Sequence, residues 1–331
     1  MIQMSARKAC TRVLLNGVAC VLLWSFCAAV LAQKYPVRPI RVVLPYGPGG
    51  NSDITARVLA QRLSESMQQQ VIVDNRPGAG GIIATEIVRK AEPDGYTLLW
   101  LNTGHAVSVS LYKTLPYDPV RDFVPVSTVG FSGLALVVSA ASPSRSVKEL
   151  VASAKSNPGK FNIGVTFVGS TNHLSAELFK SMAGIDVPVV PFKTTPALIA
   201  GVGGNETQAI FEFIPPVLPL VTSGSLRALA VTSDHRSASL PNVATLAEAG
   251  LRGYESSAWN GVAVPAKTPK AIVDRLNREI NAIVSVPQVK QRLQELGVDA
   301  RGSDSRSFHD LLVADIAKWK RVIEKANIER R

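Results

Sequence analysis

The residues best suited to chemistry in this 331-residue chain are small and polar, and they follow predicted strands. They offer main-chain N–H groups, hydroxyls and amides, with few groups that could exchange protons. They fall in four stretches, residues 46–53, 78–81, 102–105 and 169–173. Ligands of open α/β sheets lie outside the carboxyl ends of the strands, and a few well-placed polar groups are enough to orient a bound solute. The four stretches therefore favour binding over catalysis.

The first stretch is part of the sequence Leu-Pro-Tyr-Gly-Pro-Gly-Gly-Asn-Ser-Asp at residues 44–53, a tight turn between a predicted strand and a predicted helix. Its glycines, which include Gly49 and Gly50, let the backbone approach a ligand closely. Ser52 or Asp53 is suited to cap the following helix, and the free N–H groups of a helix start attract anions. The alternative is a capped connector that binds nothing, and this stretch alone does not decide between the two.

Neutral donors dominate the other stretches. Asn102 and Thr103 follow a buried strand, and Ser170 and Thr171 open a predicted helix. No Lys or Arg lies within residues 44–53 or 169–173, and the nearest basic candidate is Lys193. We therefore predict a small carboxylate ligand that is held by neutral donors.

Neither glycine-rich turn fits a nucleotide-binding motif. The sixth position of the dinucleotide fingerprint is Gly or Ala, whereas the two turns have Ser52 and Ile83 there. The chain also lacks a Walker lysine and a Gly-x-Ser-x-Gly sequence. None of its four histidines is paired at metal-ligand spacing, and we interpret His105 and His173 as hydrogen-bonded within their own loops. We predict no enzyme activity, no cofactor and no metal.

Residues 1–32 are predicted to be a secretory signal peptide. Three basic residues precede a charge-free run over residues 13–31, and the small residues at 30–32 suit a signal peptidase. A membrane anchor is the alternative for the apolar run. Cleavage after Ala32 would remove all three cysteines and leave a periplasmic protein without disulfides.

The formal net charge of +11 would fall to +8 on cleavage, because the peptide carries three basic residues and no acidic ones. The basic residues are scattered, with no run longer than Arg330-Arg331 and no interleaved aromatic residues. Surfaces that bind nucleic acid usually combine both features, so we exclude a nucleic-acid partner. A positive field that favours anionic solutes is compatible with this charge.

The chain length and the alternation of strand and helix patterns predict an α/β protein with two lobes. Three strand–helix units come first, and a crossing between lobes is expected between residues 111 and 133. The last helix has apolar residues at a 3.6-residue period from Phe308 to Ile323, so it must pack on a structure already built. We predict a first lobe of residues 33–133 and 240–331 and a second lobe of residues 134–239.

Several motifs occur in a characteristic order along the chain. The first is Tyr35-Pro36-x-Arg38-Pro39, which leads into Pro45-Tyr46-x-x-Gly49-Gly50-x-x-Asp53. Others are Asp-Asn-Arg-Pro-Gly-Ala-Gly-Gly at 74–81, Pro-Asp-Gly-Tyr-Thr-Leu at 93–98, Leu-Pro-Tyr-Asp-Pro at 115–119 and Arg-Ala-Leu-Ala-Val-Thr at 227–232. Together they resemble the Bug family, the substrate-binding proteins of tripartite tricarboxylate transporters, over nearly the whole mature chain.

The resemblance implies a two-lobed Venus-flytrap periplasmic binding protein of type II, in which each lobe is a mainly parallel sheet flanked by helices. A ligand carboxylate would be held by main-chain groups and ordered water between two glycine-bearing loops of the first lobe, and the second lobe would close over it. Carried over by motif, the first-lobe residues expected at the ligand are Tyr46, Gly49, Gly50, Asp53, Gly80 and Gly81. Those of the second lobe are Ser170, Thr171 and His173.

The chain departs from the family pattern at two places that face the cleft in the implied fold. Thr194-Thr195-Pro196 stands where the family usually has a glycine-containing segment, and Phe211-Glu212 stands where it usually has Phe-Asp. The departures add Glu212 to the expected ligand-binding residues and leave the identity of the ligand open.

The predicted function is that of a periplasmic receptor that binds a small organic anion and delivers it to the membrane permease of a tripartite tricarboxylate transporter. We expect a monomer. One alternative is a sensor that presents its ligand to a two-component histidine kinase. Another is an enzyme of the same fold, against which the missing acid–base pair counts.

Overall fold

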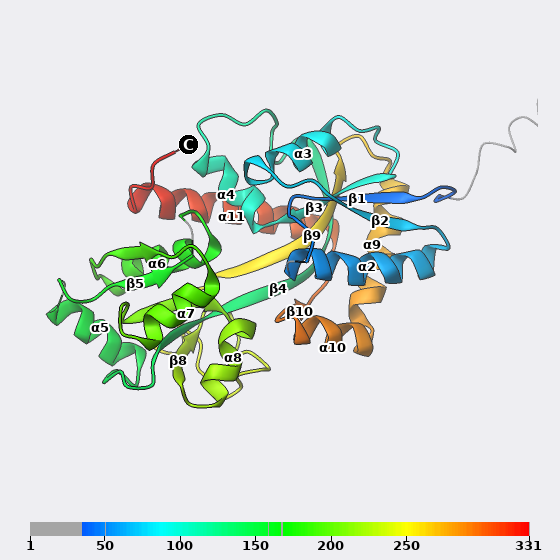
Figure 1. The fold of residues 1–331 in the computed structure, drawn as a ribbon. Helices are drawn as coiled ribbons and strands as arrows, with labels where there is room; N and C mark the ends of the chain where they lie inside the picture. Colours follow the sequence, from blue (N-terminus) through cyan, green and yellow to red (C-terminus); the bar gives the residue numbers. More distant parts are fainter. Residues whose placement is uncertain (1–34, 50, 158, 167, 331) are drawn as a thin grey trace, which may run out of the picture.

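The computed structural model describes residues 35–49, 51–157, 159–166 and 168–330. The strands of these residues form one ten-stranded sheet that passes through two lobes, with helices packed on its faces (Figure 1). The predicted two-lobed α/β architecture is confirmed. Within the described residues, no helix is both long and apolar enough to cross a membrane. The predicted signal peptide lies outside the described residues.

The first lobe contains three parallel strands in the order β2 (Val71–Asn75), β1 (Ile40–Leu44) and β3 (Thr97–Asn102). One face of this sheet packs against α2 (Asn51–Met67), α9 (Lys270–Ser285) and α10 (Pro287–Glu295). The other face packs against α3 (Ile82–Arg89), α4 (Thr103–Leu111) and α11 (Ser305–Lys325). A 3-10 turn, η1 (Ala79–Gly81), precedes α3.

The second lobe repeats this plan. Its parallel strands are β6 (Val189–Pro191), β5 (Ile163–Val165) and β7 (Ala209–Phe213). On one face lie α5 (Val147–Ser156) and α6 (Thr171–Ala183), and on the other lie α7 (Thr195–Gly203) and α8 (Ile214–Thr222). Each lobe therefore buries an apolar core on both faces of its sheet.

Two long strands, β4 (Phe123–Ser139) and β9 (Ser257–Pro265), join the lobes. β4 pairs antiparallel with β9 over residues 123–133 and with β7 and β8 (Leu226–Val231) over residues 134–139. β9 also pairs antiparallel with β3, and the short strand β10 (Asp299–Ala300) does so with β4. The three strands β2, β1 and β3 and the three strands β6, β5 and β7 are parallel as predicted, whereas the whole sheet is mixed because the crossing strands run against their neighbours.

The segment 240–256, which we assigned to the first lobe, packs with the second. Leu246 and Tyr254 are buried in the second-lobe core, and Thr245 forms a parallel bridge with Val231 of β8. The chain returns to the first lobe only at β9, because the apolar residues before that strand find their burial partners in the second lobe.

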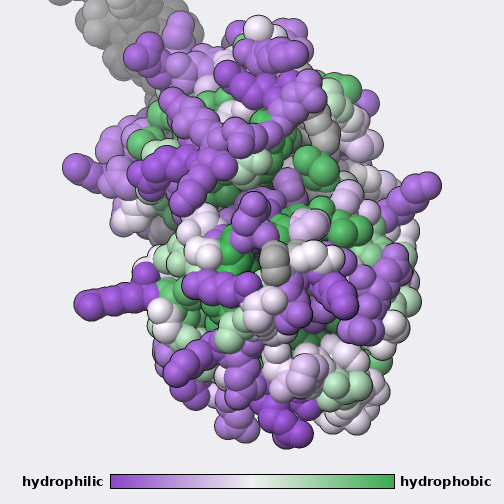
Figure 2. All heavy atoms as spheres, turned by 90° about the vertical axis from the view of Figure 1, so that its left-hand side faces the viewer, coloured by the Kyte–Doolittle hydropathy of each residue, from purple (hydrophilic) through white to green (hydrophobic). Residues whose placement is uncertain are grey.

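The side of the molecule drawn in Figure 2 is mostly hydrophilic. Polar side chains project from both halves of this face, and hydrophobic patches lie between them.

Candidate functional site

The space between the lobes forms a cavity of about 980 Å³. Six helices begin around it, α2, α3 and α4 from the first lobe and α6, α7 and α8 from the second. A helix start presents N–H groups without helical partners and the positive end of the helix dipole. The cavity is therefore surrounded by features that favour a negatively charged ligand.

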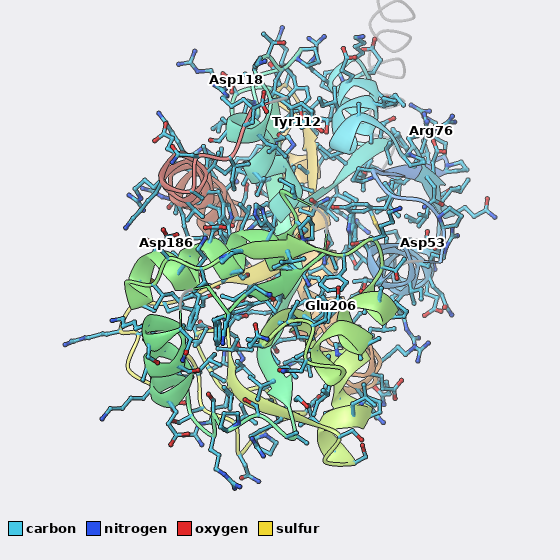
Figure 3. The ribbon with its side chains drawn as sticks, turned by 60° about the vertical axis from the view of Figure 1, so that its left-hand side comes forward. Asp53, Arg76, Tyr112, Asp118, Asp186 and Glu206 are labelled. Carbon is cyan, nitrogen blue, oxygen red and sulfur yellow. The ribbon has the colours of Figure 1, made fainter. Side chains whose placement is uncertain are left out.

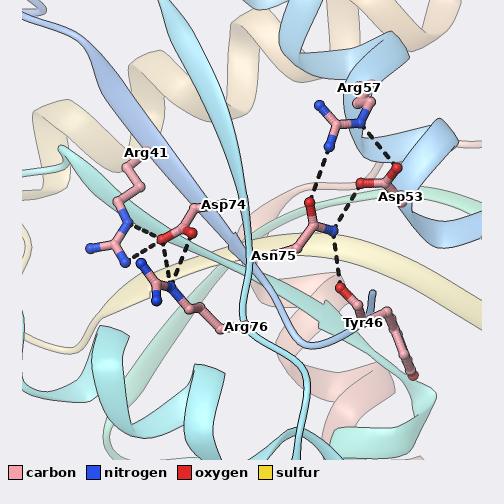
Figure 4. Close-up of polar contacts among 7 residues, drawn as sticks. All are labelled: Arg41, Tyr46, Asp53, Arg57, Asp74, Asn75 and Arg76. Carbon is pink, nitrogen blue, oxygen red and sulfur yellow. Dashed lines mark hydrogen bonds and ion pairs between the residues drawn. The ribbon is translucent and has the colours of Figure 1, made fainter. Parts of the chain in front are cut away.

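No lysine, arginine or histidine is among the described residues that line the cavity. Arginines of the neighbouring strands are engaged elsewhere: Arg41 and Arg76 both pair with Asp74 (Figure 4). An anion in the cavity would therefore be held by neutral donors and helix dipoles.

Two asparagines, Asn102 and Asn260, lie side by side in the first-lobe wall of the cavity. They are cross-strand partners on β3 and β9, so their side chains leave the sheet on the same face. Both are buried, with 7% and 8% of their surfaces exposed. Asn260 was missed by sequence reasoning. The one available signal was its polar side chain within an otherwise apolar strand.

Donors around the two carboxamides fix how they are turned. Oδ1 of Asn102 accepts hydrogen bonds from the main-chain N of Gly104 at 2.8 Å and from the Tyr46 hydroxyl at 3.1 Å. Oδ1 of Asn260 accepts one from Nε1 of Trp100 at 3.1 Å. Main-chain and indole N–H groups can only donate, so each bonded atom is the carboxamide oxygen. Neither Nδ2 has a partner among the described residues, so both can donate to a ligand.

The glycine turn before α3 forms another part of the first-lobe wall. Gly80 and Gly81 have φ values of 62° and 98°, a region that glycine adopts far more readily than other residues. A Cβ on Gly80 would lie 2.1 Å from the hydroxyl oxygen of Tyr112, so this turn passes directly against that side chain. No side chain caps α3, which leaves the N–H groups of its first turn without a side-chain partner.

The second-lobe wall is lined mainly by hydroxyls and one acid. Ser170 caps α6, because its Oγ accepts a hydrogen bond from the main-chain N of His173 at 3.1 Å. The same Oγ accepts a second one from the Thr166 hydroxyl at 3.0 Å, which leaves the Ser170 hydrogen free to donate. Thr171 is the first residue of α6 and also lines the cavity.

The acid of the second-lobe wall is Glu212, which is 2% exposed. One carboxylate oxygen accepts hydrogen bonds from the main-chain N of Phe213 at 2.6 Å and from Nδ2 of Asn172 at 3.2 Å. The other oxygen accepts one from the Thr195 hydroxyl at 3.0 Å. Burial raises the pKa of Glu212, although these hydrogen bonds partly oppose the rise. Thr195 and Glu212, which belong to the two segments that depart from the family pattern, are therefore in contact.

Asp53 does not line the cavity, and it lies within the first turn of α2 and not at the cap position. Its carboxylate accepts hydrogen bonds from the main-chain N of Gly49 at 2.9 Å, Nε of Arg57 at 3.0 Å and Nδ2 of Asn75 at 2.9 Å. Asn75 also donates to the main-chain O of Tyr46 (Figure 4). Burial acts to raise the pKa of Asp53, but the hydrogen bonds outweigh it and hold the pKa below its ordinary value. Asp53 therefore fixes the turn that carries Tyr46.

The two strand-end histidines are structural. Nδ1 of His173 accepts a hydrogen bond from the main-chain N of Gly169 at 3.1 Å, as expected for a histidine bonded within its own loop. His105 instead places Nε2 3.0 Å from the main-chain O of Pro119 and stacks on Tyr117. Burial lowers the pKa of each to about 4, so both are neutral at pH 7. Neither lines the cavity.

The structure brings eight of the predicted site residues together around the cavity. They are Tyr46, Gly80, Gly81, Asn102, Thr103, Ser170, Thr171 and Glu212. Gly49, Asp53 and His173 are not among the lining residues, since each serves the hydrogen bonds of its own turn, and Gly50 lies outside the described residues. Figure 3 shows Asp53 and Tyr112 in different parts of the first lobe. Over the described part of the chain, no group of three or more His, Cys, Asp or Glu side chains could hold a metal ion.

Comparison with known proteins identifies the family. The sequence profile described as "Tripartite tricarboxylate transporter family receptor" (TctC) matches residues 55–328. Protein BugT of Bordetella pertussis is 37% identical over 303 residues, which cover 90% of this chain and 92% of BugT. This chain belongs to the tripartite tricarboxylate transporter receptor family.

Solved structures of similar proteins support the same assignment. Rpa4515 of R. palustris, solved with adipate, is 35% identical, with a TM-score of 0.75 over 90% of this chain and 100% of that one. MatC of Rhodopseudomonas palustris with bound malate is 28% identical, with a TM-score of 0.69 over 87% and 100% of the two chains. Receptors of the tripartite tricarboxylate transporter family are periplasmic solute-binding proteins.

Proposed function

We propose that this protein binds a small organic carboxylate between its lobes and delivers it to the permease of a tripartite tricarboxylate transporter. The observation that carries the proposal is the pair of Nδ2 groups on Asn102 and Asn260, for which the described residues provide no hydrogen-bond partner. Two neutral donors side by side can reach the two oxygens of one carboxylate. Hydrogen bonds to an ionised acceptor are stronger than those between neutral groups.

The surroundings of the asparagine pair support the same ligand. Asn102 is the cap of α4, so a carboxylate at its amide would also face the positive end of that helix. Ser52, in the first turn of α2, places its hydroxyl 3.4 Å from Oδ1 of Asn260. A ligand held here would contact α2 from the early part of the chain and β9 from its C-terminal third.

The bound molecules of the relatives are consistent with this proposal. Rpa4515 holds adipate and MatC holds malate, and both molecules carry carboxylates. A cavity of about 980 Å³ is larger than such a molecule needs. Closure of the lobes or ordered water would fill the remainder.

A thermal-shift screen of refolded, ligand-stripped protein tests the binding step. At a ligand concentration of about 1,000 times Kd, binding stabilises the native state by roughly 4 kcal/mol, which raises the melting temperature by several degrees. Mono-, di- and tricarboxylates form the panel, with sugars and amines as controls. Asn260→Ala should weaken the response, whereas Asn157→Ala, at an exposed position after α5, should not. A response to sugars or amines but to no carboxylate would reject the proposal.

Export and delivery need separate measurements. We propose that the signal peptide is cleaved after Ala32, so the exported protein should have the intact mass of a chain that starts at Gln33. Retention of Met1 or acylation of a cysteine would contradict this.

If the protein delivers its ligand to a permease, carboxylate uptake by cells should require both this protein and a permease of this transporter class. Light scattering of the exported protein should give the mass of a monomer.

A further inference from the structure

Glu212 has an unusual place in a cavity that otherwise suits an anion. It is the one buried acid among the described residues that line the space, since the other acid, Glu295, is half exposed and paired with Arg292 at 2.8 Å. No ion pair joins Glu212 to a cation among the described residues. A buried carboxylate without a counter-charge is unfavourable unless hydrogen bonds compensate it.

The hydrogen bonds that the described residues make to Glu212 leave one acceptor position open. An ionised carboxylate has about four lone-pair positions, two on each oxygen. Oε1 uses two of them, for Phe213 and Asn172, whereas Oε2 uses one, for Thr195. Asn172 also donates to the main-chain O of Phe211 at 2.9 Å, so its Nδ2 has no further hydrogen to offer. The remaining position on Oε2 can therefore be filled by a donor from the ligand.

We infer that Glu212 is a specificity-determining residue that selects a carboxylate ligand which also carries a hydroxyl or ammonium group. This inference rests on the proposed function, because it takes the asparagine pair of the first lobe as the seat of the ligand carboxylate. The first-lobe wall donates to the ligand, and Glu212 in the second-lobe wall accepts from it. A second carboxylate placed at Glu212 would meet a like charge and an oxygen that cannot donate.

Ligands of matched length test this selection. Butyrate, 4-hydroxybutyrate, 4-aminobutyrate and succinate share one carboxylate and differ at the other end, and longer analogues cover other spacings. Calorimetry with the wild-type protein should show binding of the hydroxy or amino acid at least about tenfold tighter than of the equal-length dicarboxylate and the unsubstituted acid, since each such difference corresponds to about 1.4 kcal/mol. Tighter binding of 4-hydroxybutyrate than of 4-aminobutyrate would indicate a ligand with a hydroxyl group, and the reverse order would indicate an ammonium group.

Glu212→Gln is a near-isosteric test of the residue itself. The Gln oxygen can keep the bonds from Phe213 and Asn172, and the Thr195 hydroxyl can turn to accept from the new amide. The amide then directs a hydrogen, in place of a lone pair, toward the cavity. We expect the ratio of hydroxy- or amino-acid affinity to dicarboxylate affinity to fall about tenfold or more. Glu206→Gln, at an exposed acid of the second lobe that does not line the cavity, should leave that ratio unchanged.

The outcomes separate this inference from the function on which it rests. If the wild-type protein prefers a plain dicarboxylate, or if Glu212→Gln folds and keeps the wild-type order of ligands, Glu212 is structural and the inference is wrong. Should the variant fail to fold, the order of ligands on the wild-type protein still decides. Failure of every carboxylate to bind, dicarboxylates included, would instead overturn the proposed function.

Discussion

The two walls of the cleft are built by different means. The first-lobe wall uses main-chain turns and two carboxamides whose orientation is fixed by hydrogen bonds from Trp100 and Gly104. The second-lobe wall uses side chains that cap helices or hydrogen-bond to one another, such as Ser170 and Glu212. If the proposed function holds, the carboxylate would meet donors that are already oriented in the first lobe, and the second lobe would contact the other groups of the ligand.

The largest expected effect on affinity comes from replacing the Nδ2 donor of Asn260 by a carboxylate oxygen. Asn260→Asp keeps an oxygen to accept from Trp100 but places a second oxygen where Nδ2 stood. Loss of a hydrogen bond to a charged group and gain of a like charge should weaken carboxylate binding at least about 100-fold. Calorimetry measures the change, and Asn260→Ala, which removes the donor without adding a charge, should show a smaller loss. Unchanged affinity in Asn260→Asp would show that the anion binds elsewhere.

Lowering the pH should reduce the stability of the folded protein, because each lobe buries one neutral histidine. His105 and His173 each occupy the third position of a wall helix, α4 and α6, and burial lowers the pKa of each to about 4. The unfolded chain takes up protons near pH 6.5 and the folded chain does not, so stability falls from there down to about pH 4. Between pH 7 and pH 5 each histidine should reduce the free energy of unfolding by about 2 kcal/mol.

Chemical denaturation at the two pH values measures this loss. His105→Gln and His173→Gln should each remove about half of the pH dependence, whatever they do to stability at pH 7. An unfolding free energy that stays constant from pH 7 to pH 5 would contradict burial of neutral histidines in both lobes.

Replacing Asp53 should have a smaller effect, and it tests whether this residue supports the first-lobe wall or contacts the ligand. Asp53→Ala removes the acceptor that Gly49, Arg57 and Asn75 share. We expect the free energy of unfolding to fall by about 1 to 2 kcal/mol, while affinity changes less than about fivefold, because Asp53 does not line the cavity. Denaturation and calorimetry on the same samples give both numbers. Loss of affinity without loss of stability would assign Asp53 to the ligand after all.

Salt should produce the smallest effect. Because no side-chain cation was found among the described residues of the cavity wall, carboxylate affinity should change less than about twofold between about 50 and 500 mM sodium chloride. Thr171→Lys sharpens the test, since it adds a cation to the second-lobe wall and should introduce a dependence on salt. A steep dependence in the wild-type protein would mean that an exposed basic residue takes part.

The sequence predicted much of the first-lobe wall because its signals are local. Glycines after a strand and an asparagine at the start of α4 are read from a few neighbouring residues, and the structure places Gly80, Gly81 and Asn102 in the wall. Local signals failed for α8, which was not predicted. Its sequence contains three prolines, yet two stand in the first turn, where no N–H is required.

Long-range contacts account for the other errors. Asp53 looked like a cap or a ligand contact, and one of its three partners, Asn75, lies 22 residues away. Asn260 acquires its orientation from Trp100, 160 residues away, so nothing near it in sequence revealed its role. The return of the chain at β9 was misplaced for a similar reason, because burial in the second lobe decides the position of residues 240–256.

The order of segments along the chain also determines when the receptor becomes competent to bind. The second lobe is one continuous stretch of chain, whereas β3 of the first lobe pairs with β9 only after that stretch has been made. Contacts between such distant segments form slowly, because a long loop must close before they gain stability. During synthesis from the N-terminus, the early strands of the first lobe therefore wait for the C-terminal third. Asn102 meets Asn260 at this late step, so a half-folded chain would lack the carboxylate site that we propose.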